Sequence, residues 1–293
     1  MGKADRRRLE NIRQKLEAEQ AAARRSEVRR RAVLAGGSVT AVAVLVVVII
    51  AVSVGRPPAP PAPAPAAGTA RLVAREIADV PPAVFNRVGS GTATGLKAIT
   101  GEPELIAHEK PELLYMGGEF CPFCAAERWA IAAAVSRFGT LTGLHLIRSS
   151  PLDIHPDTAT LSFAGASYTS KYLEFVPVEW YGEQPDPSTP FGHVYLQHPT
   201  RQEEALFANY ADGSIPFVDI GNRFLTSTQY SPSDLAGLTW AQIAAAMHDP
   251  GSAVSKDIDG AANTISAGIC QLTHDQPAGV CRSSGVSSAS RSS

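Results

Sequence analysis

The sequence predicts an α/β domain, with a central sheet flanked by helices, attached through a spacer to one membrane-spanning helix. Three features support this prediction: an uncharged apolar run at residues 32–54, a Pro/Ala-rich run at residues 55–70, and alternating strand-like and helix-like segments through residues 71–282. The last region has about 200 residues, which is enough to bury one hydrophobic core.

The composition excludes two broad classes and reveals an uneven charge. A hydrophobic content of 44% excludes a wholly disordered chain, and four cysteines are too few for a disulfide-dense scaffold. Residues 1–31 hold 11 basic and 5 acidic side chains, whereas the other 262 residues hold 15 and 23. A basic end points to a membrane or a nucleic acid. Because five acids interrupt it, we expect lipid contact and no nucleic-acid partner.

The apolar run at residues 32–54 predicts a transmembrane helix. Its 23 residues would span roughly 34 Å as a helix, against about 30 Å of hydrocarbon core. A cleavable signal peptide is the alternative, but its apolar stretch is usually about 7–15 residues after a short basic region. The positive-inside rule then places residues 1–31 in the cytoplasm. We therefore expect a single-pass plasma-membrane protein with an extracytoplasmic domain and the lipid bilayer as a partner.

Two further segments flank the predicted domain. Residues 55–70 contain six prolines between Pro57 and Pro65, which favour an extended polyproline II spacer. Docking of a partner on these prolines is the alternative. Residues 283–293 are polar and Ser-rich, so the sequence predicts a disordered tail there.

Hydrophobic patterns predict the elements of the domain. Short apolar or β-branched runs bounded by Gly or Pro predict strands at residues 112–116, 144–147, 162–163, 171–180, 216–220 and 223–225. Helices are predicted at residues 125–138, 201–210 and 235–247. Thr200 would cap the second helix and Gly139 would end the first. The last two strands are expected to form a hairpin.

The main chemical signal is Cys-Pro-Phe-Cys at residues 121–124, between the first predicted strand and the first predicted helix. A thiol at a helix N-terminus lies near unpaired backbone N–H groups, which stabilise the nucleophilic thiolate. Pro122 suits the first helical position because its missing N–H would be unpaired there. The position predicts that Cys121 attacks a partner disulfide and that Cys124 resolves the mixed disulfide.

Two other interpretations of this cysteine pair remain open. A zinc site would need further ligands, yet Cys270 and Cys281 are not a second close pair, and His108 is the one histidine within twenty residues of Cys121. A purely structural disulfide across so short a loop would add little stability. We therefore expect a redox-active dithiol with no metal and no cofactor.

Pro216 stands at the start of the strand predicted at residues 216–220, which indicates a special turn and favours a cis peptide bond. At this point the sequence resembles the thioredoxin superfamily, whose members place a cis-Pro loop opposite the Cys-x-x-Cys helix. The resemblance implies a thioredoxin-like sheet with an inserted extended region over residues 71–282. It also implies that Ile215 and Pro216, together with Pro122 and Phe123, bind the partner chain. The cysteine motif is similar to the Cys-Pro-Tyr-Cys of glutaredoxins.

A narrower resemblance covers most of residues 75–282. The run at residues 114–129, the run at residues 171–179, Cys270 and Cys281 are similar to an uncharacterised prokaryotic family. That family is a domain of unknown function with a membrane-anchored thioredoxin-like fold. The resemblance therefore supports the fold more than it identifies a substrate.

Several residues near the pair have two interpretations. Glu119 and Glu127 are candidates for proton transfer to or from Cys124, the alternative being solvated charges at a helix start. Trp129 is expected in the core, and the histidines show no metal-ligand spacing. Cys270 and Cys281 are expected to form a structural disulfide that closes a loop of about 12 residues. The alternative is a second redox pair that passes electrons to the first.

These observations predict a membrane-anchored extracytoplasmic thiol–disulfide oxidoreductase. Its expected partners are cysteine-containing secreted or membrane proteins, with a membrane redox partner as a further candidate. The direction of electron flow stays open, because no histidine lies between the cysteines. Two alternatives remain: a non-catalytic thioredoxin-like module that binds a membrane or secreted partner, and thiol-based metal handling.

Overall fold

The computed structural model describes residue 65 and residues 68–291. None of the helices in these ranges is both long and apolar enough to cross a membrane. The predicted membrane span at residues 32–54 and the basic segment at residues 1–31 lie outside the described residues, as does nearly all of the Pro-rich spacer.

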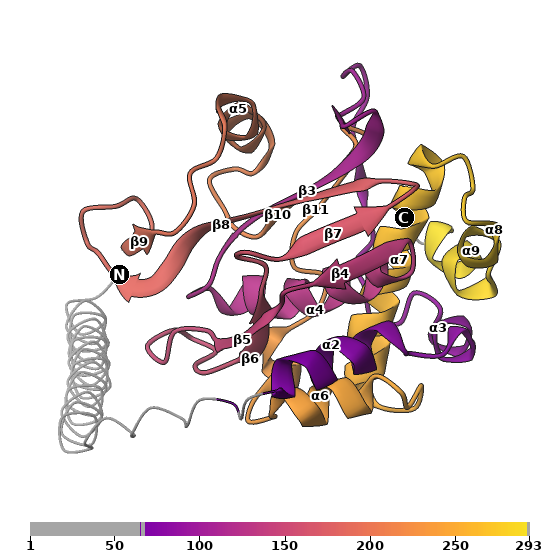
Figure 1. The fold of residues 1–293 in the computed structure, drawn as a ribbon, viewed down its shortest axis with the longest axis horizontal. Coiled ribbons are helices and arrows are strands. Elements are labelled where there is room, and N and C mark those ends of the chain that lie inside the picture. Colours follow the sequence, from indigo (N-terminus) through magenta and orange to yellow (C-terminus); the bar gives the residue numbers. More distant parts are fainter. Residues whose placement is uncertain (1–64, 66–67, 292–293) are drawn as a thin grey trace, which may run out of the picture. The chain divides into compact units, whose positions relative to one another are not determined.

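The described residues form a mixed α/β fold around a central sheet (Figure 1). β3 pairs in parallel with β8 on one side and antiparallel with β10 on the other, and β10 continues antiparallel to β11. The strand order is β1-β11-β10-β3-β8-β9, with β2 paired to the start of β3. The strands are β1 (Lys97–Ala98), β2 (Ile106–Ala107), β3 (Lys110–Gly118), β8 (Glu174–Pro185), β9 (His193–Tyr195), β10 (Phe217–Ile220) and β11 (Phe224–Thr226).

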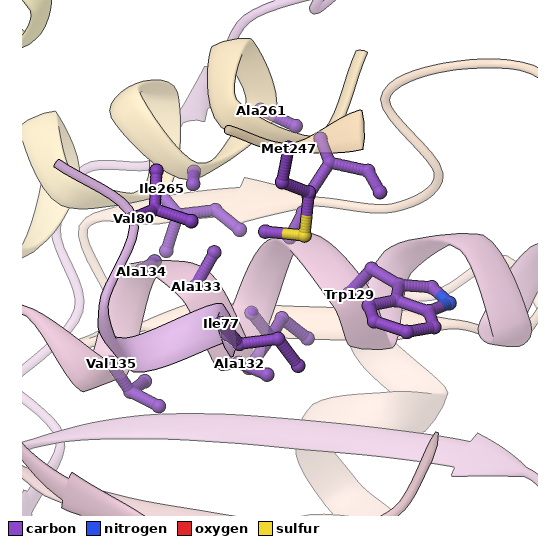
Figure 2. Packing of buried hydrophobic residues seen from close by; sticks show 14 of the residues in the cluster. Ile77, Val80, Trp129, Ala132, Ala133, Ala134, Val135, Met247, Ala261 and Ile265 are labelled. Atoms are coloured by element: carbon purple, nitrogen blue, oxygen red, sulfur yellow. The ribbon is translucent and has the colours of Figure 1, made fainter. Parts of the chain in front are cut away.

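Helices cover both faces of this sheet, and the longest pair, α4 and α7, lie side by side. Figure 2 shows part of one apolar core between these helices. Trp129 and Ala133 of α4 lie there with Ile265 of α7. Ile77 of α2 and Met247, which follows α6, complete this group. The helices are α2 (Thr69–Ala78), α3 (Pro82–Val88), α4 (Pro122–Ser136), α5 (Arg201–Tyr210), the 3₁₀ turn η1 (Pro232–Leu235), α6 (Trp240–Ala246), α7 (Ala253–Leu272), α8 (Ala278–Cys281) and α9 (Ser284–Ser290).

β3 is buried on both faces because its side chains alternate between two cores. Leu113 and Tyr115 belong to the core shared with α4 and α7, whereas Leu114 and Met116 belong to a smaller core that includes Phe207 of α5. The strand is therefore held from both sides, and its C-terminal end, which leads into the cysteine motif, has a fixed position.

Two small antiparallel sheets lie between α4 and β8 in the chain. β4 (Gly139–Thr142) pairs with β7 (Ser167–Ser170), and β5 (His145–Arg148) pairs with β6 (Ala159–Ser162). The strand expected at residues 144–147 thus exists, but its partner is β6 and not a strand of the central sheet. Its half-exposed residues fit a small ribbon better than a central strand.

The helix expected at residues 235–247 is interrupted. Gly237 has a φ of 73°, in the left-handed region that glycine tolerates, and separates η1 from α6. Thr239 then starts a new helix through a capping box with Gln242. The helix expected at residues 201–210 is present with the same bounds, and Thr200 caps it in the same way.

α7 is not among the helices predicted from the sequence, although apolar residues recur along it at helical spacing, at Val254, Ile258, Ile265 and Ile269. A Cβ on Gly260 would lie 2.5 Å from the Ser90 carbonyl oxygen, and a Cβ on Gly268 would lie 2.9 Å from Leu96 and 3.0 Å from Ile220. Glycine therefore lets α7 approach the neighbouring loop and β10 closely.

The prediction of a disordered tail at residues 283–293 is wrong for residues 284–290. These residues form α9, which packs on α7 and α3 with Val286 and Ala289 buried. The Cys270–Cys281 disulfide ties α8 to the end of α7 just before this helix. A Ser-rich segment can then fold with few apolar residues, because its docking position is already restricted.

Candidate functional site

Cys121 and Cys124 lie at the N-terminus of α4, directly after β3 and its Gly117-Gly118 end. Cys121 is the N-cap residue, and its Sγ accepts a hydrogen bond from the Cys124 backbone N–H at 3.3 Å. Cys121 is 6% exposed and Cys124 is fully buried, and both are free thiols. The helix start therefore presents one sulfur toward the surface and keeps the other inside.

The end of β3 can pass this close to the start of α4 only because residue 117 is a glycine. A Cβ on Gly117 would lie 2.1 Å from the Tyr115 hydroxyl oxygen and 3.2 Å from Cys124 Sγ. A side chain at this position would collide with groups that flank the buried thiol, so the strand can pass only without one.

The loop before β10 faces the cysteine pair. The Ile215–Pro216 peptide bond is cis, and the Ile215 carbonyl oxygen lies 3.9 Å from Cys121 Sγ. The structure thus brings Cys121 close to Ile215 and Pro216, although 94 residues separate Cys121 from Ile215 in the chain. An extended segment bound at the Ile215 backbone would have its own sulfur within reach of Cys121.

The two thiols have opposite electrostatic environments. The pKa of Cys121 is lowered, chiefly by its hydrogen bond with the Cys124 side chain and also by backbone N–H donors and the charge of Arg128, against the opposing effect of burial. The pKa of Cys124 is raised well above its usual value, first by burial. Of the two thiols, Cys121 is therefore the one that ionises more easily, and Cys124 favours its protonated form.

A buried ion pair lies on the same helix. Arg128, one turn after Cys124, donates from Nε to Glu179 Oε1 at 2.8 Å and from Nη2 to Oε2 at 2.7 Å. Both side chains are fully buried, and Glu179 also accepts from the Phe163 backbone N–H at 3.0 Å. The Arg128 charge lowers the pKa of both cysteines. Sequence reasoning missed this pair, although a charged residue inside an Ala-rich helix was a visible signal.

Tyr115 completes the polar surroundings of Cys124. The Arg128 guanidinium lies 5.9 Å from the centre of the Tyr115 ring. The Tyr115 hydroxyl and Arg128 Nη1 are buried, and neither has a hydrogen-bond partner among the described residues. Two polar groups are thus left unpaired in the buried region around Cys124, and the Arg128 charge opposes the rise in the Cys124 pKa that burial causes.

Glu119 and Glu127 are not solvated charges at the helix start. Glu119 accepts a hydrogen bond from Ser162 Oγ at 2.6 Å, and burial raises its pKa. Glu127 is fully buried and accepts from the backbone and side-chain nitrogens of Gln229, both at 3.3 Å. Burial raises the pKa of Glu127 to about 8. Burial therefore favours the protonated form of both carboxyls, and their role in proton transfer stays a prediction.

A comparison with protein families supplies the identity of the domain. The family model described as "Domain of unknown function (DUF929)" matches residues 100–271, more than half of the 293-residue chain. The chain belongs to the DUF929 family. The match includes the cysteine motif, both members of the buried ion pair and the cis-Pro loop, and it ends before Cys281. No curated protein and no solved structure matches the chain.

Two histidines lie beside the cysteine motif of this DUF929 domain. His193 stacks on Phe120 with ring centroids 3.8 Å apart, and His155 meets the edge of Phe123 at 5.7 Å. Sequence patterns could not predict either contact, because both histidines come from segments far along the chain.

The donor set for a metal is limited. Within residues 65 and 68–291, no group of three or more His, Cys, Asp or Glu side chains is placed to hold a metal ion. Cys270 and Cys281 are joined to each other by a disulfide, so they are not thiolate ligands beside the Cys121–Cys124 pair of the DUF929 domain.

Proposed function

We propose that this DUF929 domain is a thioredoxin-like thiol–disulfide oxidoreductase with Cys121 and Cys124 as its redox pair. One observation carries the proposal: the Sγ of the helix-capping Cys121 faces the Ile215 carbonyl of a cis-Pro loop at 3.9 Å. The sequence resemblance implied this juxtaposition of motif and loop. The parallel β3–β8 pair connected through α4, with β10 following the cis-Pro, further supports a thioredoxin-like fold.

The reaction that fits this geometry is a disulfide exchange. The Cys121 thiolate attacks one sulfur of a partner disulfide, forms a mixed disulfide and releases the other partner sulfur as a thiolate. Cys124 then loses its proton and attacks Cys121 Sγ, which closes the Cys121–Cys124 disulfide and releases the second partner thiolate. Two electrons pass to the partner, whose two sulfurs take up protons. The reverse sequence oxidises a partner dithiol.

The proposed location is the extracytoplasmic side of a membrane, with secreted or membrane proteins that contain cysteines as partners. The charge distribution and the apolar run at residues 32–54 support this location. An anchor and a Pro-rich spacer would restrict the search for partners to the membrane surface.

The proposal is tested on the full chain in lipid nanodiscs. We expect it to reduce insulin disulfides when supplied with a thiol reductant, or to oxidise a reduced protein when supplied with a disulfide oxidant. Cys121→Ser should abolish either activity. A contradictory result would be the absence of both activities in protein whose Cys121 and Cys124 still oxidise and reduce reversibly.

A second candidate is a non-catalytic binding module. The low exposure of Cys121 and the Phe120–His193 stack beside it favour this alternative, because they limit access to the sulfur. It predicts that a Cys121→Ser, Cys124→Ser double variant retains its cellular function, whereas the oxidoreductase loses it.

A further inference from the structure

The loop at residues 149–158, between β5 and β6, carries two unusually exposed apolar side chains. Leu152 is 89% exposed and Ile154 is 75% exposed, whereas the other exposed large hydrophobic residues of the described part range from 43% to 61%. Single exposed hydrophobic residues are ordinary on protein surfaces, but a pair presented together marks a contact site.

Hydrogen bonds hold this loop in place. The Ser149 N–H donates to the Thr158 carbonyl at 3.0 Å, and the Thr158 N–H donates to Ser149 Oγ at 3.0 Å. The Leu152 N–H donates to Ser150 Oγ at 3.2 Å, and the Ser149 hydroxyl donates to the His155 carbonyl at 3.2 Å. The backbone is therefore braced in a conformation that keeps Leu152 and Ile154 in water.

The same loop contacts the cysteine motif at two points. The Ser150 N–H donates to the carbonyl of Phe120 at 2.7 Å, and His155 lies against Phe123. Leu152 and Ile154 stand between these two contact residues in the chain. We call Phe123, Leu152 and Ile154 the apolar rim of the dithiol site.

We infer that the apolar rim selects the partner: it binds a polypeptide segment with large apolar side chains next to the reactive disulfide. This inference rests on the proposed oxidoreductase function and adds the class of its substrate. The loop that carries the rim contacts Phe120 and Phe123, which flank Cys121 in the chain, and Cys121 is recessed. A partner that reaches the sulfur as an extended segment therefore places its neighbouring side chains on the rim.

The charges of the loop favour a polypeptide over a bilayer. Asp153 stands between Leu152 and Ile154, Asp157 follows, and residues 149–158 contain no Lys or Arg. Surfaces that bind membranes pair apolar residues with basic ones, which attract anionic lipids. A bilayer seated on the rim would also cover the recessed thiol that the partner has to reach.

The test compares two peptides that carry the same internal disulfide, one flanked by Leu and Phe and the other by Ser and Gly. Pre-reduced full chain in nanodiscs reacts with each peptide in a single turnover, in which its dithiol is oxidised and the peptide disulfide is reduced. We expect the apolar peptide to react faster. Leu152→Ser with Ile154→Ser should lower the ratio of the two rate constants about tenfold.

A matched control removes exposed apolar side chains elsewhere. Leu72→Ser with Ile106→Ser, in α2 and β2, should leave the ratio as in the unsubstituted protein, because these residues are 61% and 57% exposed away from the cysteine motif. An equal ratio in the rim variant and in the control variant would overturn the inference.

A measurement of peptide binding tests the inference even if neither peptide disulfide reacts. In the Cys121→Ser, Cys124→Ser background, the rim substitutions should weaken binding of the apolar peptide about tenfold, measured by fluorescence anisotropy. Unchanged binding would overturn the inference whatever the redox activity is. An Ile154→Trp variant tests whether the bilayer occupies the rim instead. Quenching of the tryptophan fluorescence by brominated lipids in the nanodisc would show that the loop contacts the bilayer, and this result would also overturn the inference.

Discussion

Arg128 and Glu179 form a doubly hydrogen-bonded ion pair that is fully buried one helical turn beyond Cys124. A buried charge of this kind is held by its partner and polarises whatever lies near it. Here the neighbours are the two thiols, whose pKa values the Arg128 charge lowers. The pair therefore links the core of the domain to the reactivity of Cys121.

We predict that removing either charge shifts the pKa of Cys121, in opposite directions. Arg128→Met should raise it, because a stabilising positive charge is lost. Glu179→Gln should lower it, because Arg128 is then no longer offset. The measurement is the pH dependence of alkylation in a Cys124→Ser background, where Cys121 is the one free thiol left. Thiolate reactivity falls as the pH drops below this pKa, so the midpoint moves up in the first variant and down in the second.

A control variant distinguishes the effect of the charge on the Cys121 pKa from the effect of disrupted packing. Each single substitution leaves a buried charge without its partner and should cost about 3–5 kcal/mol of unfolding free energy. Arg128→Lys keeps the positive charge and should hold the midpoint near that of the Cys124→Ser parent. A shift of the same sign in both the Arg128→Met and Glu179→Gln variants would mean that disruption of packing, and not charge, sets the Cys121 pKa.

Glu127 should make stability depend on pH. Its pKa is raised by burial to about 8, so the folded state binds this proton more tightly than the unfolded state does. The contribution is complete below the unfolded value of 4.5 and is lost as the pH rises through about 8. Glu127→Gln mimics the protonated form. Urea unfolding at several pH values should show a smaller loss of stability toward alkaline pH in the variant, and identical slopes would contradict the assignment.

Gly117→Ala should destabilise the domain at the site itself. The added methyl would lie 2.1 Å from the Tyr115 hydroxyl oxygen and 3.2 Å from Cys124 Sγ, so one of these groups has to move. Overpacking of this kind costs about 1–3 kcal/mol. Gly165→Ala is the comparison for glycine replacement in general, since nothing lies within 4 Å of its Cβ, although its positive φ adds backbone strain. A smaller loss in the Gly117 variant than in the Gly165 variant, by urea unfolding, would argue against the close contact.

The role of the Cys270–Cys281 disulfide, structural or electron relay, can be determined by measuring stability and turnover separately. If it only ties α8 to α7, replacing both cysteines by Ser should cost about 2–4 kcal/mol of stability. Disulfide exchange at Cys121 should continue at temperatures where the variant is folded. If the pair relays electrons, turnover should fail in the folded variant while a single turnover from pre-reduced Cys121 and Cys124 persists.

Local signals predicted the parts of the site that depend on neighbouring residues. The cysteine motif lies between a buried strand and an Ala-rich helix, and Pro216 stands before another strand, so local patterns indicated a helix-start dithiol and a special turn. That the two face each other was implied only by the resemblance to the thioredoxin superfamily. Arg128 and Glu179 could not be paired in this way, because 51 residues separate them and only the parallel pairing of β3 with β8 brings them together. The α9 helix escaped prediction for a related reason, since its docking depends on a disulfide and on α7.

The most direct test of the dithiol mechanism is capture of its intermediate. Cys124→Ser removes the resolving thiol, so full-length protein mixed with a disulfide-containing protein should accumulate a mixed disulfide at Cys121, identified by peptide mass spectrometry. Cys121→Ser, with Cys124 intact and buried, should accumulate none. Equal trapping by the two variants, or no trapping by the Cys124→Ser protein while its Cys121 still reacts with an alkylating reagent, would contradict the account.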